Sequence, residues 1–207
     1  MILGVTPARG GSKGVPRKNL RPIHGRPLIA CTIEAAKASR LIDRYVVSTE
    51  DPEIAAVARG LGVEVMDRPR ELADDMAMTV DVLRHVLTQV DADTVVLLQA
   101  TSPIRDAGLI DRCIRRFFET EADSLATGFM CKFAPYGKNT LRRQDLEGFF
   151  YDDGNVYVIR ADILRAGDRY GTRLEPVLLD REQNVEIDDE FDFWVAEQVL
   201  RKRAGLV

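Results

Sequence analysis

The stretch VTPARGGSKGVPRKNL, residues 5–20, carries a short apolar run directly into a loop of glycines and basic side chains. The apolar run begins at residue 2 and predicts a buried β-strand, so the loop leaves the end of that strand. Three glycines allow the backbone to fold closely with its N–H groups facing inward, and four basic residues surround the turn. A flexible surface turn with solvated charges is the alternative. The position of the loop after a strand favours phosphate binding.

The loop matches neither of the two well-known phosphate-binding motifs. A P-loop needs its lysine directly after the last glycine, whereas Lys13 precedes Gly14. Pro16 argues against the direct opening into a helix that a dinucleotide-binding fingerprint requires. If the loop does bind phosphate, Arg9 offers a planar fork of donors and the lysines offer point charges.

Apolar runs alternate with segments of helical periodicity along the first two thirds of the chain. Continuous strands of valine and leucine between helices are typical of a parallel sheet that is covered on both faces. We therefore predict an α/β fold with a doubly wound, mainly parallel sheet. The expected strands are residues 2–5, 44–49, 63–66, 94–99 and 124–129, and the expected helices are residues 27–39, 52–61, 78–90 and 107–119.

The predicted fold also indicates where a ligand binds. Ligands of open α/β sheets bind beyond the carboxyl ends of the strands, so the loops after the first four strands should share one rim. Residues 131–160 break the alternation with turn signals and short β-like pieces. We interpret residues 1–207 as one domain, with residues 131–160 as an inserted β-rich segment that serves dimer contacts or acts as a lid.

The composition is that of an ordinary soluble globular chain, with 45% hydrophobic and 30% charged residues. A net charge of −4 excludes a general basic surface for nucleic acid or an anionic membrane. The apolar runs are too short to cross a bilayer, and the N-terminus lacks the pattern of a signal peptide. Three widely spaced cysteines disfavour a disulfide framework or a zinc site, so we expect a cytoplasmic protein.

Seven motifs follow one another from residue 3 to about residue 200: PARGGSKGVPRKNL, GRPLI, VVSTED, DRPRELADD, LLQATSPIR, RRQD and VEIDDEFDF. In this order they resemble the acylneuraminate cytidylyltransferase family, the CMP-sialic acid synthetases. The resemblance implies a Rossmann-like nucleotidyltransferase fold that moves CMP from CTP to the anomeric hydroxyl of a nine-carbon 2-keto-3-deoxy sugar acid, releasing pyrophosphate. It also implies Mg²⁺, with Mn²⁺ as a possible substitute, a homodimer, and a role in cell-surface glycan biosynthesis.

The resemblance places the nucleotide on the opening loop and on two later side chains. Arg9 and Lys13 are implied to stabilise charge during the reaction, and Arg68 and Thr79 to contact the cytosine base. Arg68 stands in a polar turn, so a surface charge that caps a helix is the alternative for it. The implied nucleotide-binding residues are Ala8, Arg9, Gly10, Gly11, Ser12, Lys13, Lys18, Asn19, Arg68 and Thr79.

The sugar acid is assigned by the same resemblance to Gln99, Thr101, Arg105, Arg143, Gln144 and Tyr157. Residues 101–103 also predict a turn that caps the following helix, a role that is compatible with binding. RRQD is implied to reach the sugar carboxylate, sometimes from the neighbouring subunit, with Lys138 as a weaker candidate. The family usually has asparagine where Asp153 stands, and an aspartate there would repel a carboxylate ligand.

Five carboxylates gather in residues 186–192. If residues 185–188 are extended, Glu186 and Asp188 face the same side, and paired carboxylates suit Mg²⁺. The resemblance implies these two residues as metal ligands, with Asp188 catalytic through the metal. The other acids favour the start of a helix over residues 190–202. Its predicted apolar face consists of Phe191, Trp194, Val195, Gln198 and Val199.

Two other functions stay open at this point. One is a cytidylyltransferase for 3-deoxy-manno-octulosonate or another sugar nucleotidyltransferase, and the other is a non-catalytic nucleotide-binding module. The paired acids disfavour the module, because binding alone does not need a metal pair. Neither His24 nor His85 is a predicted general base. The enzyme hypothesis requires Lys13 and Asp188 to share one cleft, because two anionic substrates must meet there.

Overall fold

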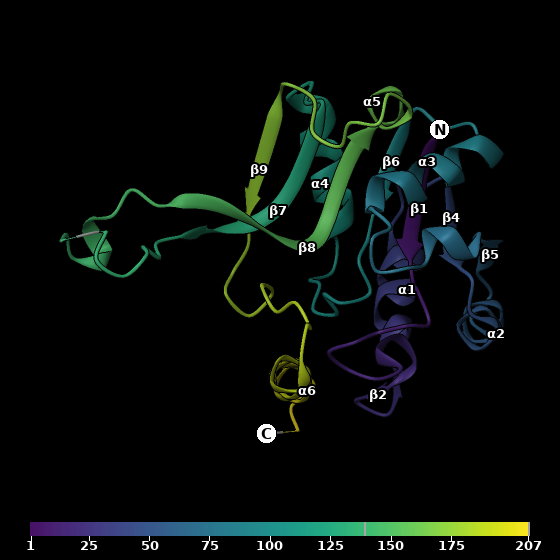
Figure 1. Ribbon diagram of the computed structural model, residues 1–207, viewed down its shortest axis with the longest axis horizontal. Coiled ribbons are helices and arrows are strands. Elements are labelled where there is room, and N and C mark those ends of the chain that lie inside the picture. The colour runs from purple at the N-terminus through teal and green to yellow at the C-terminus, as the bar shows by residue number, and fades with distance from the viewer. Residues whose placement is uncertain (139, 207) are drawn as a thin grey trace.

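The computed structural model describes residues 1–138 and 140–206, and its centre is a seven-stranded sheet (Figure 1). β1 pairs in parallel with β4 and β6, and β4 with β5, whereas β8 runs antiparallel to both its neighbours. The predicted mainly parallel sheet is confirmed. In the spatial order β5-β4-β1-β6-β8-β7-β9, the strands span Glu64–Asp67, Arg44–Thr49, Ile2–Pro7, Thr94–Leu97, Phe149–Arg160, Ser124–Cys131 and Leu174–Leu178.

Helices cover both faces of the sheet, as a doubly wound fold requires. α3 (Thr79–Gln89) and α5 (Ala161–Arg165) pack on one face, and α1 (Leu28–Ala38), α2 (Pro52–Gly60) and α4 (Leu109–Glu119) pack on the other. Each fully buried leucine or isoleucine in these layers contributes roughly 1.5–3 kcal/mol. No helix within residues 1–138 and 140–206 has both the length and the apolar character to cross a membrane. The remaining elements are the hairpin β2 (Pro22–Ile23) and β3 (Arg26–Pro27), the 3₁₀ turns Lys18–Leu20, Arg70–Leu72 and Arg143–Asp145, and α6 (Glu190–Arg203).

The segment over residues 131–160 divides into two parts of different character. Residues 153–159 of β8 are buried, and this part of the strand lies between β6 and β7 inside the sheet. The outer ends of β7 and β8 and the connection between them project from the sheet as an arm, defined by residues 129–138 and 140–151 (Figure 1). The expected excursion is therefore confined to the first part, because continuous apolar burial draws the second part into the core.

The predicted apolar face of the last helix is wrong. Phe193 and Ala196 of α6 are buried, whereas Phe191 and Trp194 are 68% and 56% exposed and stack on one another. α6 packs against Ile23 of the small hairpin and other residues near the opening loop, not on the central sheet. Of the predicted face, Val199 does pack against this cluster, so the buried stripe is rotated from the predicted one.

The opening loop is seated on the acidic segment near the other end of the chain. The Lys18 Nζ atom donates to the Ile187 carbonyl oxygen at 2.5 Å. A β-carbon on Gly14 would lie 1.9 Å from the Asp188 carbonyl oxygen, and one on Gly10 would lie 2.2 Å from the Asp51 carboxylate. At Gly10 and Gly14, neighbouring atoms thus occupy the space that a side chain would need. Neither glycine has a positive φ, so space and not backbone conformation is the reason for glycine here.

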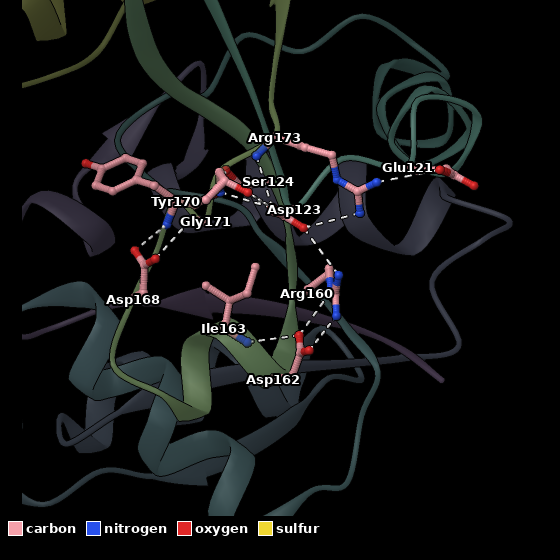
Figure 2. Close-up of polar contacts among 11 residues, drawn as sticks. Glu121, Asp123, Ser124, Arg160, Asp162, Ile163, Asp168, Tyr170, Gly171 and Arg173 are labelled. Atoms are coloured by element: carbon pink, nitrogen blue, oxygen red, sulfur yellow. Dashed lines mark hydrogen bonds and ion pairs between the residues drawn. The ribbon is translucent and has the colours of Figure 1, made fainter.

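A carboxylate at the start of β7 holds the chain that leads into β9 (Figure 2). The Asp123 carboxylate accepts hydrogen bonds from the Thr172 and Arg173 N–H groups at 3.0 Å and lies 3.2 Å from the Arg160 guanidinium. The N–H donors from Thr172 and Arg173 hold the pKa of Asp123 well below its usual range. One side chain therefore fastens β9 to the edge of the sheet.

We expect Gly14→Ala to lower the free energy of unfolding by about 1–3 kcal/mol, because the new methyl group overlaps the backbone of Asp188 and one segment must move. Gly11→Ala is the matched control, because nothing lies within 4 Å of the β-carbon that it adds to the same loop. Urea unfolding of both variants measures the difference. Equal stabilities would show that the loop does not depend on this contact.

We expect Asp123→Asn to lower the melting temperature by several degrees at neutral pH. Folding favours the ionised form of the Asp123 carboxyl group. The stabilisation from Asp123 is therefore complete above the ordinary aspartate pKa of about 4 and is lost as the pH falls below it. The gap between the two melting curves should therefore close in acid. Asp91→Asn is the control, because Asp91 forms a fully exposed ion pair with Arg165. A gap that persists unchanged at pH 2 would contradict this account.

Candidate functional site

A cavity of about 360 Å³, here called the rim cavity, opens beyond the carboxyl ends of β1, β5 and β6. This is the predicted position for a ligand of an open α/β sheet. Lys13 and Asp188 line the same cavity although they are far apart in the sequence. The predicted site residues that line it are Arg9, Ser12, Lys13, Lys18, Asn19, Arg68, Thr79, Gln99, Thr101 and Asp188.

The basic side of the rim cavity is paired with an acid that the sequence did not single out. Arg9 Nη1 lies 2.9 Å from Asp75 Oδ1, and Lys13 Nζ lies 2.6 Å from Asp75 Oδ2. Hydrogen bonds from Lys13 and then Arg9 lower the pKa of Asp75. The two cations thus converge on one pair of oxygens, which is the geometry that a phosphate group would need. Asp75 lies within the motif DRPRELADD, but an acid in a loop gives no local signal of such a role.

Lys18 and Asn19 shape the loop while they line the cavity. Asn19 Nδ2 donates to the Arg9 carbonyl oxygen at 2.9 Å. Burial lowers the pKa of the Lys18 ammonium, and the nearby Asp188 and Glu186 carboxylates oppose that shift. The Lys18 ammonium lies between the loop and these two carboxylates. Its positive charge therefore reduces the repulsion between the carboxylates and any anion that enters the cavity.

Arg68 is almost fully buried at the far end of the cavity. Its Nη2 atom lies 2.7 Å from Glu50 Oε2, and Glu50 Oε1 accepts the Gly10 N–H at 2.7 Å. Burial disfavours the charged form of Glu50, but the hydrogen bonds from Arg68 and Gly10 outweigh it and lower the pKa. The Arg68 Nε atom is buried without a hydrogen-bond partner among the described residues. Glu50 is a second residue that the sequence reasoning missed.

Asp188 lines the acidic side of the rim cavity, whereas Glu186 does not line it and lies 3.5 Å from Thr101 Oγ1. Ile187 between them is fully buried and its N–H donates to the Thr101 carbonyl oxygen at 2.8 Å, which fastens the segment to the loop after β6. Burial and then the Asp188 charge raise the pKa of Glu186 to about 7. Two carboxylates that repel each other in a partly buried place suit a divalent cation. No cluster of three or more candidate metal ligands occurs within residues 1–138 and 140–206, so a cation here would also need water or phosphate oxygens.

Several predicted residues lie outside the rim cavity. Ala8, Gly10 and Gly11 belong to the opening loop but do not line the cavity. Arg105 lies behind the cavity floor, where its guanidinium donates to the Gln99 carbonyl oxygen at 2.7 Å. Arg143 and Gln144 lie on the arm, and the Arg143 guanidinium stacks on the Phe133 ring at 4.6 Å.

Tyr157 faces a separate cavity of about 440 Å³ over β7, β8 and β9. Its hydroxyl donates to Asp152 Oδ2 at 2.5 Å, and the Arg169 guanidinium lies 4.3 Å from its ring centre. Asp153 does not face the rim cavity at all, because its side chain is buried and accepts a hydrogen bond from Thr127 Oγ1 at 2.7 Å. The expected repulsion of a carboxylate ligand by Asp153 therefore does not arise through direct contact.

Comparison with known proteins agrees with this geometry. The Cytidylyltransferase family model matches residues 3–185. The chain is 30% identical to post-translational flagellin modification protein B of Campylobacter coli, over 98% of this chain and 96% of that protein. It is 27% identical to the N-acylneuraminate cytidylyltransferase of Escherichia coli O18:K1:H7 over 98% of this chain and 52% of that protein. For N-acylneuraminate cytidylyltransferase A of Danio rerio, the identity is 32% over 94% of this chain and 50% of that protein. The chain thus spans about half the length of these two enzymes.

Solved structures agree on the fold. CMP:2-keto-3-deoxy-manno-octonic acid synthetase in complex with CTP superposes with a TM-score of 0.77 at 17% identity, over 98% of this chain and 99% of that one. A cytidylyltransferase from Leptospira borgpetersenii gives 0.69 at 16% identity, over 99% of this chain and 94% of that one. These likenesses confirm the Rossmann-like nucleotidyltransferase fold. With the family model covering most of the chain, we conclude that this protein belongs to the cytidylyltransferase family.

Proposed function

We propose that this protein transfers CMP from CTP to the anomeric hydroxyl of a nine-carbon 2-keto-3-deoxy sugar acid and releases pyrophosphate. The observation that carries the proposal is the shared cavity of Lys13, on the opening loop, and Asp188, on the acidic segment. The similarity to the N-acylneuraminate cytidylyltransferases supports the choice of a nine-carbon acceptor. We infer a cytoplasmic setting, where CTP is available, and a role in cell-surface glycan biosynthesis.

Repulsion between two anionic substrates is the main obstacle to this reaction. The oxygen of the sugar hydroxyl attacks the α-phosphorus, the bond from that phosphorus to pyrophosphate breaks, and the hydroxyl proton is released to water. Arg9 and Lys13 exchange Asp75 for phosphate oxygens and receive the charge that moves onto pyrophosphate. Arg68, which lines the rim cavity, is placed to bind the cytosine base. Positioning of the two substrates and neutralisation of their charge carry the reaction.

Glu186 and Asp188 would hold the divalent cation, Mg²⁺ or in its place Mn²⁺. When bound, the ion would neutralise phosphate charge and lower the pKa of the attacking hydroxyl. Its binding also removes the repulsion between the two carboxylates. Gln99 and Thr101, at the same end of the cavity, are placed to orient the sugar acid.

The direct test measures pyrophosphate release from CTP and Mg²⁺ with a panel of keto sugar acids. We expect turnover with nine-carbon acids and little with the eight-carbon 3-deoxy-manno-octulosonate. The Asp188→Ala variant should lose turnover by about 100-fold or more while retaining CTP binding, because it removes one carboxylate from the pair but none of the phosphate-binding cations.

Glu197→Gln is the control for that variant, because it removes one acid from the same region on α6 without touching the rim cavity. Preference for the eight-carbon acid would shift the substrate assignment. CTP binding without pyrophosphate release from any keto acid would indicate a nucleotide-binding module. Normal turnover of Asp188→Ala at saturating Mg²⁺ would contradict the metal assignment.

We further infer a homodimer that uses the arm. Phe133 and Tyr136 of the arm are largely exposed, as are Phe149 and Tyr151 at its base. Exposed aromatic side chains in this number on one projection are typical of an interface. A second copy that covers the arm would also bring Arg143 toward a neighbouring rim cavity, which explains why Arg143 lies far from its own.

We expect sedimentation velocity to give twice the chain mass of 23.2 kDa for the wild type. The double variant Phe133→Ser and Tyr136→Ser should shift toward the monomer, because it removes apolar contact area from the interface. Phe118→Ser is the control, because Phe118 is an exposed aromatic on α4, away from the arm. A wild type that sediments as a monomer, or a dimer that survives the double variant, would overturn the inference.

A further inference from the structure

A layer of buried polar groups lies directly behind the floor of the rim cavity, and Arg105 is at its centre. Arg105 Nη2 donates to the carbonyl oxygens of Gln99 at 2.7 Å and Asn155 at 2.8 Å. Its Nη1 atom donates to Thr32 Oγ1 at 2.8 Å, and its Nε atom donates to the Asn155 oxygen at 3.1 Å. One side chain thus joins the loop after β6, the strand β8 and the helix α1.

Arg105 has no ion-pair partner within residues 1–138 and 140–206. Burial lowers the pKa of its guanidinium to about 10, so the group stays charged at neutral pH. Burying a cation without a carboxylate costs several kcal/mol unless its donors are well satisfied. Four hydrogen bonds to oxygen atoms provide that satisfaction. They use the planar fork of the guanidinium, which a lysine ammonium lacks.

Asp153 holds the N–H group of Asn155, the residue whose carbonyl oxygen accepts hydrogen bonds from Arg105. Its Oδ1 atom accepts the Asn155 N–H at 3.0 Å, while Arg105 donates to the Asn155 carbonyl oxygen. The backbone of Asn155 is therefore fixed between the Asp153 carboxyl group on its N–H side and the buried Arg105 guanidinium on its C=O side. The pairing of β7 with β8 shifts register between Ala126 and Gly128, which are next to this point.

Asn155, the residue held in this way, directly follows Gly154, whose backbone packs near Glu186 and Gln99. Gly154 has φ +71, and a β-carbon there would lie 3.0 Å from Glu186 Oε1 and 3.4 Å from Gln99 Nε2. Arg105 also holds the Gln99 carbonyl oxygen, and the Gln99 side chain lines the rim cavity. A shift of Arg105 would therefore move Gln99, which lines the rim cavity, and Gly154, which packs against the Gln99 side chain.

We propose that Arg105 and Asp153 are a coupled pair of positioning residues, which set Gln99 and Gly154 for the sugar acid and do not themselves bind substrate. The proposal rests on the proposed function only for the identity of the acceptor. It replaces the expectation that Arg105 contacts the sugar. It also gives Asp153 a use, since Asp153 and Arg105 hold the N–H and the C=O groups of the same residue, Asn155.

The test combines steady-state kinetics with a double-mutant cycle. Arg105→Lys keeps the charge but loses the fork, so we expect kcat/KM for the sugar acid to fall by about 10- to 100-fold while KM for CTP stays within about twofold. Asp153→Asn keeps the shape and removes the charge. Thr32→Val removes one acceptor of Arg105 in case the larger changes impair folding, and it should shift the same sugar-acid parameter to a smaller extent.

Unfolding free energies of Arg105→Met, Asp153→Asn and the double variant require no substrate. If the two charges compensate each other, the double variant should lose clearly less than the sum of the single losses. Arg26→Met is the control. Arg26 and Arg105 both line a second cavity, separate from the rim cavity, but Arg26 pairs with Glu34 at the surface.

The outcomes separate the two proposals. Additive unfolding energies, or equal losses in the CTP and sugar-acid parameters, would overturn the positioning pair and leave the proposed function intact. If the wild type has no turnover with any keto acid, the proposed function fails, and the unfolding cycle still decides whether the pair is coupled.

Discussion

The contact between the opening loop and the backbone at residues 187–188 is the constraint on which the site depends. It joins a basic segment near the N-terminus to an acidic segment almost 170 residues later. Gly14 permits this contact because it has no side chain, and Lys18 fixes it with a hydrogen bond to Ile187. Without this contact the cations and the carboxylates would be separate surface features. With it, they form opposite walls of one cavity.

The site is built in layers that grow more buried with distance from the ligand. Arg9 and Lys13 stand partly in solvent, where they can exchange partners. Glu50 and Arg68 lie deeper and fix the loop to the base end of the cavity. Beneath them, hydrogen bonds to backbone oxygens and N–H groups replace flexible ion pairs.

Much of the fold could be predicted because apolar periodicity reports burial directly. The strands and helices of the first two thirds follow their predicted ranges within a few residues, and the parallel order follows from the alternation. β8 was harder, because turn signals at residues 152–155 hide the strand that continues through them. The face of α6 was predicted from its largest side chains, but its surroundings decide which face is buried, and Phe191 and Trp194 remain outside.

The site was predicted less completely for a related reason. Sequence motifs indicate which residues belong together, but not which of them face the ligand and which support it. Arg105 follows Gln99 and Thr101 in one motif, yet its side chain passes behind the floor. Asp75 and Glu50 gave no signal, since a carboxylate in a loop has many ordinary uses.

The bond from Asp75 to Arg9 and Lys13 has a consequence for turnover. In the proposed function, the Asp75 carboxylate competes with every phosphate group that enters, so part of the attraction between the loop and the phosphate is offset by the loss of the Asp75 contacts. The same carboxylate is ready to return when the products separate. An enzyme of this kind must bind a highly charged nucleotide and then release a highly charged leaving group. Competition from an internal carboxylate helps the second step, because it shortens the time for which pyrophosphate stays bound.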